Sequence, residues 1–228
     1  MKKWSLFILL GAAALLVGTL VLRTEGDGTA QAQTGPGEAA ADAQEAARVR
    51  AEIQNDPVAP TFAPKGHDVT LVMFTDYQCP YCRKVHPVLE ELKRADPKVK
   101  IVYRDWPIFG APSVEAARAA IASTYQGKHA AFNDALMAMP GKVSSPGIRA
   151  AADKAGVDWN RLQADLEKHD DEIDAALGRT SKYAAMMGLS GTPALLVGPY
   201  LIPGAIDITG LREAVELART DPTGTAAK

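Results

Sequence analysis

Apolar runs and helical patterns alternate along the first half of this chain. A nearly continuous apolar, β-branched run predicts a buried strand over residues 68–75. After it, Val85, Leu89 and Leu92 fall on one face at helical spacing, which predicts a helix from about Cys82 to Ala95. The pattern also predicts two further strands, a short edge strand at 61–62 and another at 100–104.

Helical patterns fill the middle of the chain, and strand patterns return near its end. Apolar stripes predict successive helices from Ser113, a candidate N-cap, to about Met187. Short apolar segments at 193–198 and 200–202 predict a pair of strands, and a last helix is predicted over 209–219. The predicted order is therefore β-α-β, a helical block, then β-β-α.

The first 23 residues form a candidate export segment. Lys2 and Lys3 precede an uncharged run, residues 4–22, that is long enough to span a bilayer. Lysines before such a run indicate that the following chain is exported. A small-residue cleavage site, Ala30-Gln31-Ala32, lies well past the run, so an uncleaved membrane anchor is favoured over a cleaved signal peptide. Either outcome places the rest of the chain in an oxidising compartment.

Composition divides the remainder into a stalk, a folded part and a tail. Residues 24–57 are rich in Ala, Gln, Gly and Pro and are predicted to be a linker or stalk, part of which can form a helix. Residues 58–220 are predicted to fold as one domain, and 221–228 to be a disordered tail. A net charge of −2 without a basic patch argues against a nucleic-acid partner, and no convincing dimerisation domain is present, so a monomer is expected.

The chemistry of the chain is concentrated in Cys79-Pro80-Tyr81-Cys82, which holds its only two cysteines. The pair lies where the strand over 68–75 passes into a helix, with Cys79 at the helix start. Unpaired N–H groups and the positive end of the helix dipole favour a thiolate there. Such a placement lowers a cysteine pKa from about 8.5 into the range of roughly 3.5–7.5. The segment therefore predicts a redox-active dithiol, Cys79 and Cys82, that exchanges with a disulfide.

Two other uses of the cysteines are a structural disulfide and a metal site. A structural disulfide is disfavoured because closing so short a loop removes little entropy from the unfolded chain. A copper- or zinc-binding module remains an alternative, since Cys79, Cys82 and His86 share one helical face. A closed zinc site lacks ligands, however, because the chain has no second cysteine pair.

Several segments resemble one known family, the bacterial periplasmic DsbA-family thiol-disulfide oxidoreductases. Residues 74–84 resemble the family's active-site segment, and Gly191-Thr192-Pro193 resembles the segment around its cis-proline. Residues 103–110 with 113–118, and residues 201–205, resemble the second strand with its helical entry and the last hairpin. The similarity extends from about Thr61 to Arg219.

The resemblance implies an α/β protein with a thioredoxin fold, in which a helical domain is inserted over residues 109–188. It also implies that the Thr192–Pro193 bond is cis and lies beside the dithiol. Pro80, Tyr81, Thr192 and Pro193 would then bind substrate, with the Thr192 backbone pairing with an extended substrate chain as an added strand.

One position departs from the family pattern. Many relatives carry a buried acid six residues before the first cysteine, where this chain has Met73. An acid there could move a proton to or from Cys82. Water or Asp76 could substitute, and Asp76 is equally suited to cap a strand end or turn.

By this resemblance the chain is predicted to oxidise cysteine pairs of exported proteins in the periplasm, tethered to the inner membrane by residues 4–22 if the leader is kept. Cys79 would form the mixed disulfide and Cys82 would be the resolving thiol; no organic cofactor or metal is expected. A membrane partner, either a quinone-linked oxidase or a reductase, would reset the dithiol. A disulfide isomerase or reductase of the same fold remains the alternative, because Pro80-Tyr81 also occurs in glutaredoxins and Thr192 in isomerase- and reductase-type relatives.

Overall fold

The computed structural model describes residues 36–224, and a five-stranded mixed sheet lies at the centre of this part of the chain. Its order is β1-β3-β2-β4-β5. The central strand β2 pairs parallel with β3 and antiparallel with β4. The strands are β1 (Thr61–Phe62), β2 (Val69–Thr75), β3 (Val99–Asp105), β4 (Ala194–Val197) and β5 (Tyr200–Pro203).

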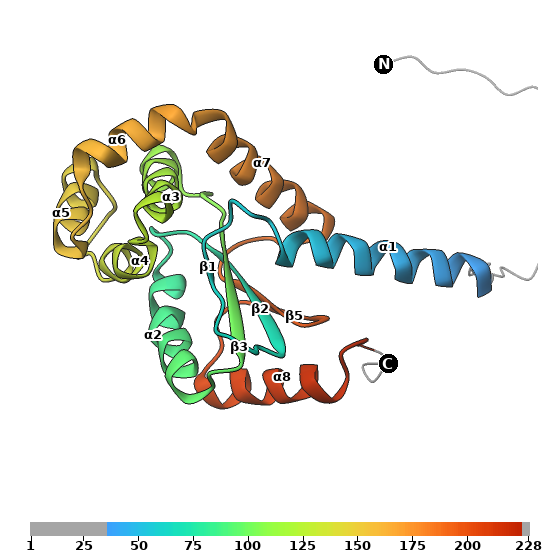
Figure 1. The fold of residues 1–228 in the computed structure, drawn as a ribbon. Coiled ribbons are helices and arrows are strands. Elements are labelled where there is room, and N and C mark those ends of the chain that lie inside the picture. The colour runs from blue at the N-terminus through green and yellow to red at the C-terminus, as the bar shows by residue number, and fades with distance from the viewer. Residues whose placement is uncertain (1–35, 225–228) are drawn as a thin grey trace, which may run out of the picture.

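Helices cover both faces of the sheet because alternate residues of β2 point to opposite sides (Figure 1). Leu71 and Met73 belong to a core that also contains residues of α2 (Pro80–Ala95) and α8 (Ile208–Thr220). Val72 and Phe74 face the other side, where α1 (Pro36–Gln54) and α7 (Asp170–Met186) contribute side chains. The near-continuous apolar run of β2 thus reflects burial on two faces.

The predicted helical block lies between β3 and β4 and covers the end of the sheet where β2 and β3 finish (Figure 1). It contains α3 (Ala111–Ala122), a short 3-10 turn over Ser123–Gln126, α4 (His129–Met137), α5 (Ser145–Ala155), α6 (Trp159–Lys168) and α7. The predicted order, β-α-β then helices then β-β-α, is therefore confirmed for the folded part.

The N-cap prediction for Ser113 is wrong. Helix α3 begins at Ala111 after Gly110, which has a φ of 93° and gives no side-chain cap. Pro112 supplies the helical φ at the start of the helix, where a missing N–H costs nothing. Ser113 lies inside the helix, and its hydroxyl donates instead to Asp76 Oδ1 at 2.8 Å.

The end of the predicted linker is packed against the sheet. Ile53, in the last turn of α1, is 1% exposed, and its carbonyl accepts from Arg104 Nη2 at 2.8 Å. Arg104 also pairs with Asp56 at 2.7 Å, and Arg179 from α7 pairs with the same carboxylate at 2.8 Å. The buried Arg104 and Asp56, together with the more exposed Arg179, therefore connect the end of α1 to β3 and α7.

Two terminal predictions fall on residues outside the described range. The signal or anchor segment (1–23) lies wholly outside it, as do residues 225–228 of the predicted tail. Within residues 36–224, no helix combines the length and the hydrophobicity that a membrane crossing requires.

Candidate dithiol active site

The end of β2 and the start of α2 place the two cysteines. Cys79 is the N-cap of α2, with an extended backbone, and its Sγ accepts from the Cys82 N–H at 3.4 Å. Pro80 follows it in the first turn, where its fixed φ suits the helix. The sulfur of Cys79 therefore takes the role that a serine or aspartate oxygen usually has at a helix start.

The surroundings of Cys79 stabilise its thiolate. Hydrogen bonding from the Cys82 thiol is the largest influence, and the Thr192 side chain and the N–H groups of Cys82 and Tyr81 add to it. Together they outweigh burial and lower the pKa of the Cys79 thiol to about 5. The sequence predicted this direction from the helix start alone, whereas in the structure the neighbouring thiol contributes most.

Cys82 has the opposite character. Its pKa is raised above the ordinary thiol value, first because its proton is shared with Cys79 and then because the side chain is buried. The residue is inaccessible to solvent. The two sulfurs therefore differ in protonation at neutral pH, Cys79 as a thiolate and Cys82 as a thiol.

The segment before β4 lies against the reactive sulfur. The Thr192–Pro193 peptide is cis, as the resemblance implied, and the Cys79 thiol form donates to the Thr192 carbonyl oxygen at 3.2 Å. Thr192 is half-buried and Pro193 is buried, whereas Pro80 and Tyr81 are exposed. The four residues predicted to bind substrate are thus divided between an exposed pair on α2 and a less accessible pair opposite.

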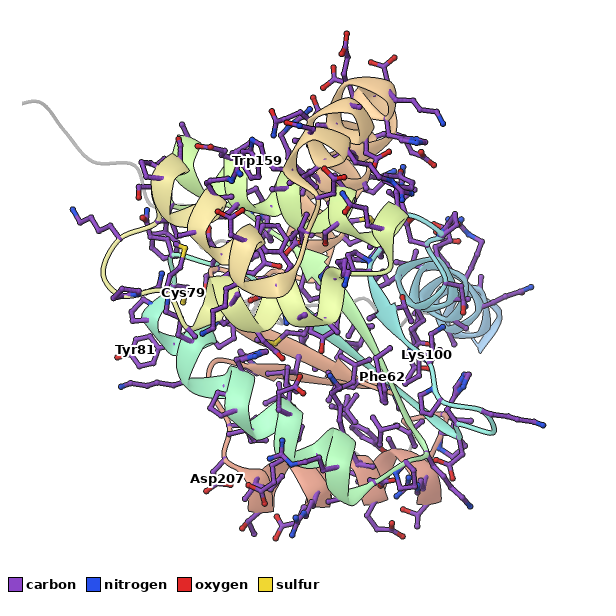
Figure 2. The ribbon with its side chains drawn as sticks, turned by 60° about the vertical axis from the view of Figure 1, so that its left-hand side comes forward. Phe62, Cys79, Tyr81, Lys100, Trp159 and Asp207 are labelled. Atoms are coloured by element: carbon purple, nitrogen blue, oxygen red, sulfur yellow. The ribbon has the colours of Figure 1, made fainter. Side chains whose placement is uncertain are left out.

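Cys79 is less accessible than the sequence suggested. The residue is 1% exposed, because the helix start and the Thr192–Pro193 segment cover it. Tyr81, two residues later in the first turn of α2, is 57% exposed, and Figure 2 shows both residues at the same end of α2. The reactive cysteine is thus more enclosed than the tyrosine beside it.

Asp76 organises the loops around the site. Its carboxylate accepts from the N–H groups of Gln78 at 2.7 Å, Ile108 at 2.8 Å and Phe109 at 3.2 Å, and from the hydroxyl of Ser113. Four donors occupy this buried carboxylate. The geometry therefore favours the capping interpretation of Asp76 over a role in proton transfer.

Exposed apolar side chains lie on the segments that follow Cys79 and β3. Large apolar side chains with exposures between 37% and 57% lie on both segments that Asp76 joins: Tyr81, Ile108, Phe109 and Val114. Gln78 links the two segments by donating to the Phe109 carbonyl at 3.1 Å. We call these four residues the apolar rim.

A second buried acid, which the sequence analysis missed, lies at the end of β3. Asp105 is 3% exposed, and neither of its carboxylate oxygens has a hydrogen-bond partner. Burial is the main reason that its pKa is raised to about 8; the neighbouring Tyr77 lowers it and Asp76 raises it further. One signal was available, since Asp105 directly follows a predicted strand whose parallel partner ends just before Cys79.

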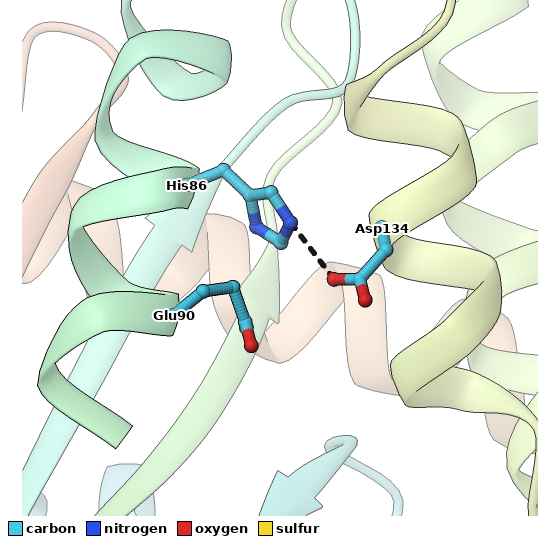
Figure 3. A group of neighbouring side chains, drawn as sticks. All are labelled: His86, Glu90 and Asp134. Atoms are coloured by element: carbon cyan, nitrogen blue, oxygen red, sulfur yellow. Dashed lines mark hydrogen bonds and ion pairs between the residues drawn. The ribbon is translucent and has the colours of Figure 1, made fainter. Parts of the chain in front are cut away.

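The structure does not bring His86 to the cysteines. Its Nε2 lies 2.9 Å from Asp134 Oδ1, so the imidazole faces α4 of the helical block (Figure 3). His86, Glu90 and Asp134 hold ligand-capable atoms within 4.8 Å of one another, and within residues 36–224 this is the one such group of three. Lys93 already pairs with Glu90 at 2.8 Å, so these groups are satisfied without an ion. A metal site built from Cys79, Cys82 and His86 is therefore not assembled in this part of the chain.

Comparison with known proteins agrees with this geometry. The family model of the DSBA-like thioredoxin domain matches residues 70–216. A thioredoxin-like oxidoreductase from Silicibacter pomeroyi DSS-3 is 42% identical and superposes with a TM-score of 0.71, covering 75% of this chain and 98% of its own. A periplasmic thioredoxin-like protein from Salmonella enterica serovar Typhimurium is 31% identical, with a TM-score of 0.69 over 76% of this chain and 97% of its own.

A third similar structure is that of a thiol-disulfide exchange protein. The thiol-disulfide exchange protein alpha-DsbA2 from Wolbachia pipientis is 25% identical, with a TM-score of 0.72 over 80% of this chain and 98% of its own. These similarities confirm the predicted α/β class, a thioredoxin fold with an inserted helical domain.

The chain also matches longer proteins, and the match covers only a part of their length. The Na(+)/H(+) antiporter NhaA 1 of Salinispora arenicola (strain CNS-205) is 28% identical over 157 residues, which is 68% of this chain and 24% of the antiporter. The chain thus spans about a quarter of the length of the curated relatives it matches.

Proposed function

The chain belongs to the DSBA-like thioredoxin domain family, and from this premise we propose that it is a thiol-disulfide oxidoreductase that oxidises cysteine pairs of exported proteins. The observation that carries the proposal is the contrast between the two sulfurs. The pKa of Cys79 is lowered to about 5, while that of Cys82 is raised. A stable Cys79 thiolate stabilises the reduced dithiol, and this makes the disulfide form oxidising.

The reaction begins with the Cys79–Cys82 disulfide. A substrate thiolate attacks Cys79 Sγ, the bond to Cys82 breaks, and Cys82 Sγ leaves with the electron pair and takes up a proton. A second substrate thiolate then attacks the substrate sulfur of the mixed disulfide and expels Cys79 as a thiolate. Two electrons pass from the substrate to the dithiol, and no organic cofactor or metal enters these steps.

The surfaces around Cys79 suit an extended peptide. We propose that the backbone of Thr192, whose carbonyl oxygen lies 3.2 Å from Cys79 Sγ, pairs with a substrate strand beside the sulfur, and that Pro193 contacts the same substrate. Pro80 and Tyr81 flank the sulfur on the opposite side, and the apolar rim offers contacts to side chains beyond it. Substrates with apolar residues near a cysteine fit this surface best.

Location and partners follow from the proposed activity. We place the domain in the periplasm, where disulfides persist, with residues 4–22 as a tether to the inner membrane. A membrane redox partner, either a quinone-linked oxidase or a reductase, would return the dithiol to its working state. The similarity to a periplasmic thioredoxin-like protein supports this compartment.

The reduction potential of the Cys79–Cys82 couple tests the direction. Equilibration of the full chain with glutathione buffers should give a value near −120 mV for an oxidase, and a value near −270 mV would assign it as a reductase. A Cys82→Ser variant, whose Cys79 thiolate can attack a substrate disulfide but has no partner thiol to release the product, should accumulate a mixed disulfide with a disulfide-containing substrate, whereas Cys79→Ser should not. Absence of exchange in the wild-type protein would refute the proposal.

A further inference from the structure

We infer that Asp105 exchanges the proton of Cys82 through the hydroxyl of Thr75, in place of the acid that Met73 lacks. The inference rests on the proposed function, because Cys82 gains or loses a proton only when the dithiol reacts. Asp105 would act through Thr75, and not by direct contact with the sulfur.

The register of the sheet places Asp105 beside Thr75. The two residues are partners at the ends of the parallel strands β2 and β3. Side chains of directly paired residues point to the same face of a sheet. On β2, Thr75 shares its face with Met73, which packs in the same core as both cysteines. On β3, Asp105 shares its face with Tyr103, which belongs to the same core. Asp105 and Thr75 therefore point into the layer that holds Cys82.

The side chain that precedes Asp105 on β3 points to the opposite face of the sheet, as expected for adjacent strand residues. Arg104, one position before Asp105, faces the opposite layer and pairs with Asp56 and the end of α1. Tyr77 lies in the layer of the cysteines and is close enough to Asp105 to alter its pKa. Both neighbours thus place the Asp105 carboxylate on the side of α2.

The polar atoms between Asp105 and Cys82 lack other partners. Neither oxygen of Asp105 nor the Oγ1 of Thr75 makes a hydrogen bond, although all three are buried. Buried polar groups without a partner are rare and call for a functional reason. The Thr75 hydroxyl also lowers the pKa of the Cys82 thiol, which indicates that it lies near that sulfur, and the sheet register pairs Thr75 with Asp105.

Other acids and hydroxyls near the site are already occupied. The Asp76 carboxylate already accepts from four donors, so it is not free to exchange a proton with Cys82. The Tyr77 hydroxyl donates to Asn133 Oδ1 at 3.1 Å and does not satisfy Asp105. Among the described residues of this layer, Asp105 is thus the acid that remains free to exchange a proton.

The protonation of Asp105 suits the direction of the proposed reaction. With a pKa of about 8, the carboxyl group is about nine-tenths protonated at pH 7. The titratable groups that act on it are Asp76 and Tyr77 from the β2–α2 loop, and Cys79 and Cys82 lie in the core of the same layer. A neutral acid in this place is ready to donate when Cys82 leaves as a thiolate.

The proton steps balance in both directions. When a substrate thiolate breaks the Cys79–Cys82 bond, Cys82 Sγ takes the Thr75 hydroxyl proton, and Thr75 takes the Asp105 proton. The carboxylate then regains a proton from the solvent. In reduction of a substrate, the Cys82 thiol loses its proton along the same path to the Asp105 carboxylate before Cys82 Sγ attacks Cys79.

The test is the pH dependence of disulfide reduction in Asp105→Asn. The oxidised full chain is reacted with a small thiol at a constant thiolate concentration, so that pH acts only on the protein. The wild-type rate constant should be level below pH 7 and fall as pH rises through about 8. In the variant the rate at pH 7 should be about 100-fold lower, and the fall should be absent.

Thr75 provides a matched pair that tests the path without changing the acid. Thr75→Ser keeps the hydroxyl and should retain the wild-type pH profile. Thr75→Val has nearly the same shape without the hydroxyl and should give the flat, slower profile of Asp105→Asn. Equal profiles for the Ser and Val variants would overturn the role of the hydroxyl.

A direct titration keeps the inference falsifiable even if Asp105→Asn does not fold. The carboxyl carbon of Asp105 in the reduced wild-type protein, followed by NMR with isotope-labelled aspartate, should titrate near pH 8. A midpoint near the ordinary pH 4 would overturn the inference. In that case exchange by Cys79 and Cys82 would persist, so the failure would be distinguishable from failure of the proposed function.

Discussion

Two residues, Pro80 and Tyr81, separate two cysteines whose sulfurs hold opposite protonation states. Cys79 at the N-cap receives hydrogen bonds that favour its thiolate, and Cys82, one turn later, is enclosed by the core. The largest of these hydrogen bonds comes from the Cys82 thiol itself. The protonation state of each cysteine therefore depends on the other cysteine.

Titration of the Cys79 thiolate by ultraviolet absorbance should show this dependence. The reduced protein should have a midpoint near pH 5, and about 99% of Cys79 should be ionised at pH 7. Cys82→Ala removes the largest stabilising donor, so its midpoint should move toward the ordinary thiol value. A wild-type midpoint above neutrality would contradict the site as described.

The buried Asp105 should make folding stability depend on pH in a recognisable way. A carboxyl group whose pKa is raised on folding from 3.8 to about 8 stabilises the fold fully below pH 4, and this contribution is lost as pH rises to 8. Asp105→Asn removes the titration. Its stability relative to wild type should therefore improve by up to about 1.4 kcal/mol per pH unit between pH 4 and pH 8.

Urea denaturation at several pH values measures this difference. Asp153→Asn provides a control, since Asp153 is exposed and pairs only with Arg149 on its own helix. A constant difference between Asp105→Asn and wild type across the range would show that Asp105 is ionised in the folded protein.

Among the elements, α1 shows how a weakly apolar helix is held by charge. Arg104 is 1% exposed. Its guanidinium pairs with the Asp56 carboxylate and also donates to carbonyl oxygens in the last turn of α1. Burial raises the pKa of Asp56, but hydrogen bonds from Arg179, Val58 and Arg104 outweigh this and lower the pKa to about 2. The contribution of Asp56 to stability is thus present above pH 4 and lost as pH falls through 2.

Asp56→Asn should destabilise the protein by about 3–5 kcal/mol at neutral pH, because it leaves the buried Arg104 without a countercharge. Chemical denaturation measures the loss. Glu216→Gln, which alters an exposed pair at 3.8 Å, should stay within about 0.5 kcal/mol of wild type. A similarly small loss for Asp56→Asn would show that α1 is held mainly by Ile53 and its apolar neighbours.

The order of elements was predictable from the sequence because apolar periodicity reports burial directly. The run before Cys79 and the stripe on α2 lie within one or two residues of the observed bounds. Contacts between distant segments were not predictable in the same way. Ser113 resembled an N-cap locally, yet its hydroxyl serves Asp76 from another loop. Asp105 resembled a strand-end acid until the parallel register placed it beside Thr75.

At the scale of the whole molecule, Arg83 joins the helical block to the active-site helix. Its guanidinium donates to the carbonyl oxygens of Tyr77 at 2.9 Å, Met139 at 3.0 Å and Gly141 at 2.7 Å. The last two lie in the α4–α5 connection, so one side chain spans the active-site turn and the insertion. His86 and Asp134 make a second connection one turn further along α2.

Arg83→Ala should loosen this junction. The loss of three charge-assisted hydrogen bonds should cost about 1–3 kcal/mol and raise amide hydrogen exchange over residues 138–144. Lys84→Ala is the control, because Lys84 is exposed and lies over the Tyr81 ring without a contact to the block. Unchanged exchange in Arg83→Ala would mean that apolar packing alone holds the insertion.

Helix α1 leaves the body of the protein on the side away from Cys79 (Figures 1 and 2). Its 19 residues span about 28 Å, so its first turn lies well apart from the reactive sulfur. A surface or carrier linked at that end would leave the dithiol facing outward, open to bulky clients. The direction of one helix thus decides which way the enzyme would present its chemistry when immobilised.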